Sequence, residues 1–228
     1  WVAGANGGTS YYVLRSSNLR EGVATPTWDI SRTMAFGGRV NYFLLSNAAN
    51  PAGLHGQVYV VVDKTLGPTK DHVYYLDSNY RNTTNPRDLY MMRSTDNGAT
   101  WGSSTRFNSD PVNQNKWHWH GTIAVAPSGR VDVIWYDTRE STAINQCRMY
   151  QSSSWDGGTT WSPQVPITPQ FNSHAGWPVQ QKLGDYIGMI SHNDKAHIAY
   201  AATFTGGQDV YYMALPMQHP VISGSVAL

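Results

Sequence analysis

Cysteine, glutamate and lysine are scarce in this chain of 228 residues, which has one Cys, Cys147, two Glu and five Lys. A single cysteine excludes an internal disulfide framework, so stability must come from a packed core, which a chain of this length can build. Few Glu and Lys leave few strong helix formers. No window of eleven or more residues has apolar side chains at helical spacing, which excludes long amphipathic helices.

Charge and long apolar runs are also missing. Charged residues are 14% of the chain, against about 25% in ordinary soluble domains, and the formal net charge is +1. The basic residues form no run, which excludes nucleic acid as a partner. No stretch approaches the roughly 18 apolar residues of a membrane span. The chain begins at Trp1 without Met or leader, so we expect a processed mature protein or an excised piece.

Aromatic residues and turn formers are abundant instead: 12% of the chain is Phe, Trp or Tyr, and 21 residues are Gly. We expect a secreted or surface-displayed β protein from this composition. Short segments alternate apolar and polar side chains and end at Gly, Asn, Asp or Pro, as β-strands do. The predicted strands are Gln57–Asp63, Leu89–Ser94, Gly121–Ala126, Val131–Asp137, Arg148–Ser154, His197–Ala202 and Asp209–Leu215.

Two types of strand repeat along the chain. The first type, apolar residues followed by Arg-Ser, occurs at Tyr11–Ser16 and Leu89–Ser94, with weaker copies from Arg148 and Val210. The offset of about sixty residues fits the four-stranded blades of a β-propeller, with a β-sandwich as the alternative. The second type ends in Asp or its substitute, precedes the first, and occurs at Val60–Asp63, Val133–Asp137 and Ile198–Ala201.

Two segments of the pattern S-x-D-x-G-x-T-W follow strands of the first type. We call residues 94–101 box 1 and residues 154–161 box 2. Asp caps turn amides, Gly permits a positive φ, and Trp can cover the turn, so we expect structural hairpin turns. The defining residues are Ser94, Asp96, Gly98 and Trp101 in box 1 and Ser154, Asp156, Gly158 and Trp161 in box 2.

The boxes resemble the Asp boxes of sialidase-like, BNR-repeat propellers, which lie on the turn between the third and fourth strands of a blade. Gly129–Arg139 (GRVDVIWYDTR) is similar to a stretch common in bacterial members, and Gly184–Gly188 to their late G-D-Y-I-G strand. The resemblance implies an all-β propeller with four-stranded antiparallel blades. Sialidase-type rings usually have six blades, and 228 residues correspond to about four. We therefore expect a single propeller domain over residues 1–228, or the C-terminal portion of one.

Ligands bind propellers near the central axis, and the resemblance implies that the boxes face away from that site. Alternation along a strand would place Trp117 and Trp119 on one side and His118 and His120 on the other. The His pair could then bond a sugar or chelate a metal, and a Trp could stack on a pyranose. The alternative is a Trp pair wedged between blades with a solvated His pair. Zinc is disfavoured because no Cys or third His stands nearby in sequence.

Four further residues complete the set of ligand candidates. Asp137 and Arg139 end a strand of the second type, and Asp185 and Tyr186 are placed on the inner strand of the last blade. The alternative for the first two is a buried Asp–Arg pair that ties neighbouring blades. We expect no cofactor. Calcium in acidic turns is kept as an alternative, although no D-x-D-x-D-G pattern occurs.

A working sialidase implies three arginines on the substrate carboxylate, a Tyr nucleophile activated by Glu, and an Asp acid/base. The Arg-Ile-Pro or Arg-Leu-Pro motif usual in the first blade is absent, and only Glu21 and Glu140 could activate a Tyr. We therefore expect a module that binds a carbohydrate or a cell-surface glycoprotein without catalysis. The rivals are an exo-glycosidase of sialidase type, whose site is shared with blades outside this chain, and a purely structural blade array.

Overall fold

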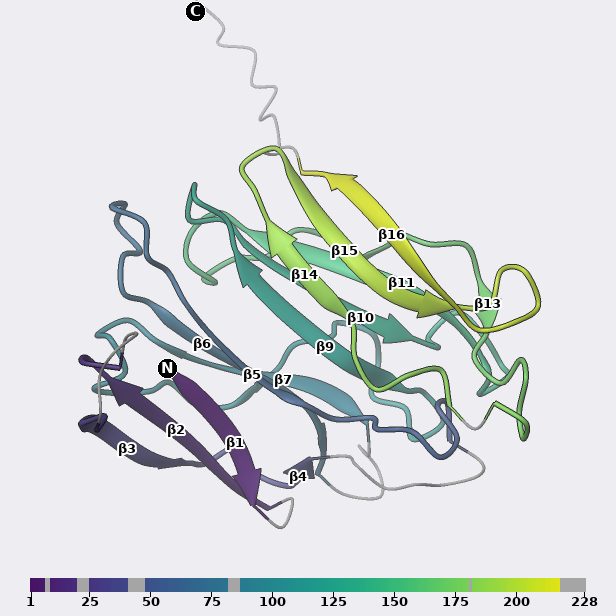
Figure 1. Ribbon diagram of the computed structural model, residues 1–228, viewed down its shortest axis with the longest axis horizontal. Helices are drawn as coiled ribbons and strands as arrows, with labels where there is room; N and C mark the ends of the chain where they lie inside the picture. Colours follow the sequence, from purple (N-terminus) through teal and green to yellow (C-terminus); the bar gives the residue numbers. More distant parts are fainter. Residues whose placement is uncertain (7–8, 20–24, 41–47, 82–86, 181, 218–228) are drawn as a thin grey trace, which may run out of the picture.

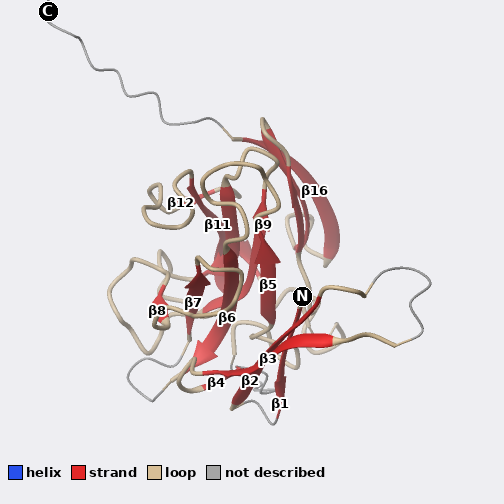
Figure 2. Cartoon of the chain, turned by 90° about the vertical axis from the view of Figure 1, so that its left-hand side faces the viewer, coloured by secondary structure: helices blue, strands red, loops and turns tan. Residues whose placement is uncertain are grey.

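The regular structure of this protein is β-strand throughout the part that a computed structural model describes, residues 1–6, 9–19, 25–40, 48–81, 87–180 and 182–217 (Figure 1). The strands form four antiparallel sheets, in agreement with the predicted all-β propeller architecture (Figure 2). All seven predicted strands are found, with ends displaced by up to three residues. Among the described residues, no helix has the length and apolarity to cross a membrane.

Each sheet is built from consecutive strands. The first sheet contains β1 (Val2–Asn6), β2 (Ser10–Ser16) and β3 (Trp28–Met34). The second contains β4 (Arg39–Val40), β5 (Val58–Val62), β6 (Val73–Tyr80), β7 (Asp88–Ser94) and β8 (Thr105–Arg106). The third contains β9 (His118–Val125), β10 (Val131–Asp137), β11 (Gln146–Ser154), β12 (Val165–Pro166) and β13 (Phe171–Asn172). The fourth contains β14 (Gly188–Ser191), β15 (Lys195–Ala202) and β16 (Asp209–Pro216).

The predicted equivalence of Val60–Asp63 with Val133–Asp137 is wrong. Val73 pairs with Ser94 in the second sheet as Val131 pairs with Ser154 in the third, so β10 corresponds to β6, a strand the pattern did not predict. Val60 lies in β5, which takes the place of β9. An apolar run before Asp is common to both kinds of strand, and only pairing distinguishes them. The sequence analysis missed β6 because its last residues, Asp77–Tyr80, are mostly polar and interrupt the apolar pattern.

The strands β5, β9 and β14 each pair with the strand that follows them in their own sheet, and the three lie side by side (Figure 1). Their last residues, Val60–Val62, Ile123–Val125 and Met189–Ser191, line one cavity of about 450 Å³ together with Trp1. The three strands therefore run in the same direction, and their first residues meet at the opposite end. We call the end where they begin the entry end and the end where they finish the exit end. The two boxes follow β7 and β11 and lie at the exit end.

Hydrophobic side chains pack the sheets face to face. In β6, Tyr74 and Leu76 point into the cluster shared with the third sheet, while Tyr75 points into the cluster shared with the first. This alternation follows from the two-residue period of a strand. Full burial of one such side chain stabilises the fold by about 1.5–3 kcal/mol, so both faces of the central sheets contribute to stability.

Candidate functional site

The two boxes form turns with matching hydrogen bonds. The Asp96 carboxylate accepts from the Thr100 amide at 2.8 Å and its hydroxyl at 2.6 Å, and the Asp156 carboxylate accepts from the Thr160 amide at 2.9 Å and its hydroxyl at 2.6 Å. The bonds from Thr100 lower the pKa of Asp96 to about 2. Burial raises the pKa of Asp156, but the bonds from Thr160 outweigh it and lower that pKa to about 2. Each carboxylate therefore stabilises the turn of its own box.

The box tryptophans pack between sheets at the exit end. Trp101 meets Tyr75 edge to face at 6.4 Å, and Trp161 meets Phe107 in the same manner at 4.8 Å. An arginine before box 1 adds a tie between sheets, because Arg93 Nη1 donates to the carbonyl of Gly157 in box 2 at 2.6 Å. The boxes therefore hold the sheets together, remote from the candidates at the entry end.

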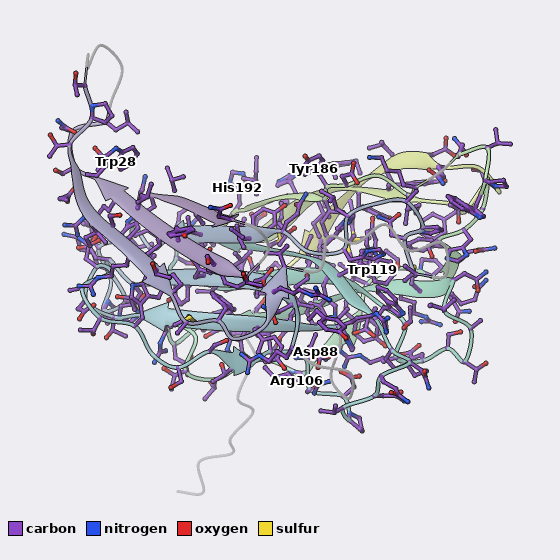
Figure 3. All side chains as sticks on the ribbon, turned by 90° about the horizontal axis from the view of Figure 1, so that it is seen from below. Trp28, Asp88, Arg106, Trp119, Tyr186 and His192 are labelled. Carbon is purple, nitrogen blue, oxygen red and sulfur yellow. The ribbon has the colours of Figure 1, made fainter. Side chains whose placement is uncertain are left out.

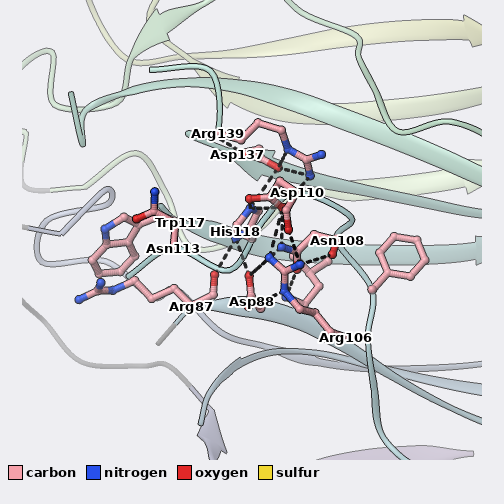
Figure 4. A network of polar contacts seen from close by, with 12 residues as sticks. Arg87, Asp88, Arg106, Asn108, Asp110, Asn113, Trp117, His118, Asp137 and Arg139 are labelled. Atoms are coloured by element: carbon pink, nitrogen blue, oxygen red, sulfur yellow. Dashed lines mark hydrogen bonds and ion pairs between the residues drawn. The ribbon is translucent and has the colours of Figure 1, made fainter. Parts of the chain in front are cut away.

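Six charged side chains gather between the second and third sheets at the entry end (Figure 4). They come from β7, β8, β9, β10 and the segments that follow β8 and β10. We call this set the charge cluster: Asp88, Arg106, Asp110, His118, Asp137 and Arg139.

His118 is the centre of the charge cluster. Its Nδ1 lies 3.0 Å from Asp88 Oδ1, and its Nε2 lies 3.1 Å from Asp110 Oδ1 and 3.5 Å from Asp137 Oδ2. Burial lowers the pKa of His118, but the Asp137 charge and the hydrogen bonds to Asp110 and Asp88 outweigh it and raise the pKa to about 10. Protonated His118 and two arginines then balance three carboxylates, so the buried cluster is electrically neutral.

Arg139 forms ion pairs and hydrogen bonds with neighbours inside the protein. Its Nη2 lies 2.6 Å from Asp137 Oδ2 and donates to Gln164 at 3.0 Å, while its guanidinium carbon lies 4.5 Å from the centre of the Tyr150 ring. Asp137 also accepts from Trp135 Nε1 at 2.8 Å and has a fully buried carboxylate. Arg139 Nη2 also lies 3.5 Å from Asp110 Oδ1, which follows β8, so the pair can tie the third sheet to the second while it offers little access to a ligand.

A Tyr–Glu pair is present beside the charge cluster. The Tyr150 hydroxyl donates to Glu140 Oε1, and Arg148 Nε lies 3.2 Å from Glu140 Oε2. Burial and then the hydrogen bond to Glu140 raise the pKa of Tyr150. Tyr150 belongs to β11, which β10 and β9 separate from the inner side of the sheet. The pair therefore lies away from the line where the first strands of the blades meet.

Strand alternation does not hold over Trp117–His120. His120 has a φ of 53°, and the pairing of β9 with β10 shifts between Ile134 and Tyr136. Both histidines are buried, contrary to the solvated pair of the alternative. Trp119 is 0% exposed and packs on Tyr136 at 5.3 Å, so it presents no ring face to a ligand.

His120 joins β9 to the segment before β5. Its Nε2 donates to the carbonyl of Leu54 at 3.0 Å. Burial lowers the pKa of His120 to about 4, against the opposing effects of the Leu54 bond and the Asp185 charge. The ring is therefore a neutral hydrogen-bond donor at physiological pH.

Asp185 and Tyr186 precede β14 rather than forming part of it, which corrects their predicted place on an inner strand. Asp185 Oδ1 accepts from the Leu54 amide at 3.0 Å, and Asp185 O accepts from Gln57 Nε2 at 2.6 Å. The Tyr59 hydroxyl donates to Gln57 Oε1 at 2.9 Å. We call Gln57, Tyr59, Asp185 and Tyr186 the axial cluster.

The axial cluster reaches solvent through Tyr186, whereas Gln57, Tyr59 and Asp185 are half-buried. Tyr186 is 71% exposed, and in Figure 3 it lies at one surface with Trp119 inside the molecule and Asp88 and Arg106 toward the opposite side. Burial raises the pKa of Asp185, but an ion pair with Lys182 and the Leu54 amide outweigh it and lower the pKa. A carboxylate, an amide and two phenols at one open edge can together donate and accept hydrogen bonds and offer an aromatic face.

The structure thus divides the predicted candidates into three places. His118, Asp137 and Arg139 belong to the charge cluster, Asp185 and Tyr186 to the axial cluster with His120 behind them, and Trp119 to the core. Sequence reasoning missed Asp88, Arg106, Asp110, Gln57 and Tyr59, which no motif marks. Within the described residues, no group of three or more His, Cys, Asp or Glu is arranged to hold a metal ion.

Comparison with known proteins supports the fold. No protein-family model matches the chain, and no curated protein matches it. Among solved structures, a Hadza microbial sialidase is similar at 14% identity and a TM-score of 0.53, over 91% of this chain and 40% of its own. An α-L-arabinofuranosidase from Fusarium graminearum is similar at 14% identity and a TM-score of 0.51, over 90% of this chain and 54% of its own. The chain spans about half the length of these structures or less, and the likeness shows the fold alone.

Proposed function

We propose that this chain is a carbohydrate-binding propeller module that holds a glycan at the axial cluster without catalysis of its own. The observation that carries the proposal is the exposed ring of Tyr186 at the entry end, which follows Asp185 in the chain and lies near Tyr59, whose hydroxyl bonds to Gln57. The two solved structures with the same fold are named for enzymes that act on glycosides, which supports the ligand class.

The chemistry of the axial cluster suits a neutral sugar. The apolar face of a pyranose or furanose gains from contact with an exposed aromatic ring, and its hydroxyls both donate and accept hydrogen bonds. Asp185 and Gln57 supply acceptors and donors next to that ring, and their bonds to Leu54 and to each other hold them in place before a ligand arrives. Such preorganisation lowers the entropic cost of binding. A secreted or surface location is part of the proposal and rests on composition.

The test is titration of the protein with galactose, arabinose and N-acetylglucosamine, followed by ligand-observed NMR or calorimetry. At least one of these sugars binds saturably, and Tyr186→Ala weakens its affinity about tenfold through loss of the aromatic contact. Tyr212→Ala is the matched control, because Tyr212 is a tyrosine of similar exposure, 67%, that lies on β16 and is not part of the axial cluster. Saturable binding of none of the sugars, or equal affinity of the Tyr186→Ala variant and the wild type, would refute the proposal.

The second candidate function, an exo-glycosidase of sialidase type, is favoured by the Tyr150–Glu140 contact. Catalysis on a carboxylated sugar needs convergent cationic donors, and loss of one preorganised donor costs on the order of a hundred- to thousandfold in rate. Arg139 and Arg148 are paired with Asp137 and Glu140. We therefore expect no detectable hydrolysis of an aryl sialoside. Activity that disappears in both Tyr150→Phe and Arg139→Ala would favour the enzyme instead.

A further inference from the structure

Three sheets share a Thr-Trp pair followed by a residue that differs from sheet to sheet. The segments are Thr27–Asp29 in the first sheet, Thr100–Gly102 in the second and Thr160–Ser162 in the third. The third residue of each segment lies beside the penultimate residue of the neighbouring strand. Gly102 N donates to Arg93 O at 2.9 Å, and Ser162 N donates to Ser153 O at 2.8 Å.

In the first sheet, the penultimate residue of β2 is Arg15, the counterpart of Arg93, and the Asp29 carboxylate neutralises its charge. Arg15 Nη1 donates to the carbonyl of Asn97 in box 1 at 3.1 Å, as Arg93 does toward box 2. Arg15 Nε and Nη2 each lie 2.7 Å from Asp29 Oδ2. In the third sheet neither charge is present, and Ser153 N donates to the Ser162 hydroxyl at 2.9 Å.

In the second sheet, the arginine is present and the carboxylate is not. Arg93 Nη1 donates to Gly157 O at 2.6 Å and to the Thr159 hydroxyl at 3.0 Å. Across the described ranges of the chain, no carboxylate lies within ion-pair distance of Arg93, and Gly102 stands where Asp29 stands in the first sheet. The repeat therefore keeps the cation and omits its anion at this position.

A cavity of about 540 Å³ occupies the space beside Arg93, between the second sheet and box 2. This volume is in the range of small-ligand sites, about 300–1,000 Å³. Phe107 and Trp161 form an aromatic wall, with ring centres 4.8 Å apart. The residues that matter for recognition are Arg93, Ser103, Thr105, Phe107, Thr159 and Trp161.

We propose that this cavity binds the carboxylate of an acidic monosaccharide residue, a uronate, in the position relative to Arg93 that the Asp29 carboxylate has relative to Arg15. A guanidinium with unused N–H donors matches a carboxylate with charge-assisted hydrogen bonds. The cavity is larger than a bare carboxylate requires, and its hydroxyls and aromatic rings match the hydroxyls and C–H faces of a sugar ring. The site is distinct from the axial cluster.

The experiment is calorimetric titration with glucuronate, with glucose and acetate as probes of the sugar ring and of the carboxylate alone. Glucuronate binds saturably and more tightly than either probe, and Arg93→Gln weakens it about 10- to 100-fold. Arg15→Gln is the matched control, because it removes the equivalent arginine where Asp29 already occupies the site. Tyr186→Ala leaves glucuronate binding unchanged, which separates this site from the proposed function.

A second variant introduces into the second sheet the Arg–Asp pair of the first sheet. A Cβ at Gly102 would meet only the Arg93 carbonyl at 3.5 Å, an ordinary contact, so the position accepts a side chain. Gly102→Asp supplies the missing carboxylate to Arg93 and abolishes glucuronate binding while the fold is kept, as circular dichroism checks. Gly102→Ala keeps the wild-type affinity.

Three outcomes would overturn the proposal. The first is no saturable binding of glucuronate, and the second is a Gly102→Asp variant that is folded and binds as the wild type does. The third is an affinity for acetate equal to that for glucuronate, because the ligand would then be a bare carboxylate and not a sugar residue.

Discussion

At the entry end, the first and second sheets meet around the buried side chains of Asp77, Asn79 and Tyr11, which we call the neutral interface, whereas the second and third sheets meet around the charge cluster, which we call the charged interface. At the first interface, Asp77 accepts from Asn79 Nδ2 at 3.0 Å, and the hydroxyl of Tyr11 lies beside both. Burial raises the pKa of Asp77 to about 7, against the hydrogen bonds from Asn79 and Tyr11. At the second interface, burial also raises the pKa of Asp88, but His118 and Arg106 outweigh it and lower the pKa to about 2.

The difference follows from one position of the repeat. The pairing of β6 with β7 and of β10 with β11 places Asn79 and Asp137 at equivalent sites. Asn79 is neutral and bonds to Asp77 and Tyr11, whereas the Asp137 carboxylate pairs with Arg139 and faces His118. A buried carboxylate without a cation takes up a proton, and one among cations stays ionised. The same fold can therefore join two sheets in either way.

The largest expected effect comes from removing the central cation of the charged interface. His118→Leu leaves three carboxylates facing two arginines, and loss of one partner from a buried ionic group costs about 3–5 kcal/mol in the free energy of unfolding. Urea unfolding at pH 7 measures the loss. His192→Leu is the control, because His192 is exposed at the end of the fourth sheet, and it changes stability by about 0.5 kcal/mol or less. Equal losses for the two variants would contradict the charged interface.

Alkaline pH weakens the same interface. The pKa of His118 is about 10 in the folded protein and about 6.5 in an unfolded chain, so the folded state binds more protons between these values. Its contribution is complete below pH 6.5 and is lost as the pH rises to about 10, at up to about 1.4 kcal/mol per pH unit. Unfolding free energies of the wild type minus those of His118→Leu, measured from pH 6 to 10, isolate this loss. A constant difference would disprove it.

The neutral interface responds in a lower range of pH. Asp77 has a pKa of about 7 when folded, above the 3.8 of an ordinary Asp, so its protonated form is favoured by folding. The contribution is complete below pH 3.8 and is lost as the pH rises to about 7, opposite to an ion-paired Asp. The stability of the wild type relative to Asp77→Asn therefore falls between pH 4 and 7, as chemical unfolding at a series of pH values measures. A rise over that range would reverse the assignment.

The smallest effect is expected at the exit end of the charged interface. Asp156→Ala leaves the Thr160 amide and hydroxyl in box 2 without their acceptor, but the site is exposed and water replaces the carboxylate. The free energy of unfolding falls by about 1 kcal/mol, the usual loss for a capping side chain. Asp156→Asn retains one acceptor oxygen and loses less in the same thermal or urea unfolding assay. Binding of neutral sugars at the entry end is unchanged in both variants.

The sequence by itself determined the seven predicted β-strands and the two boxes, because alternation, turn residues and capping carboxylates act over a few neighbouring residues. It did not predict β6, whose Asp77 and Asn79 interrupt the apolar pattern. The charge cluster joins Asp88, Asp110 and Asp137 with their cations, and no local motif connects positions so far apart in the chain.

The tertiary structure alone decided which candidates face solvent. The φ of 53° at His120 and the register shift opposite it break the alternation that the four residues Trp117–His120 predict, so all four are buried. The tertiary structure also decided which arginine forms an ion pair with a carboxylate. Arg15 and Arg93 look alike in sequence, but Asp29 reaches one and Gly102 faces the other only after the strands pair. Side-chain environment depends on strand pairing and sheet packing, which a short segment of sequence does not contain.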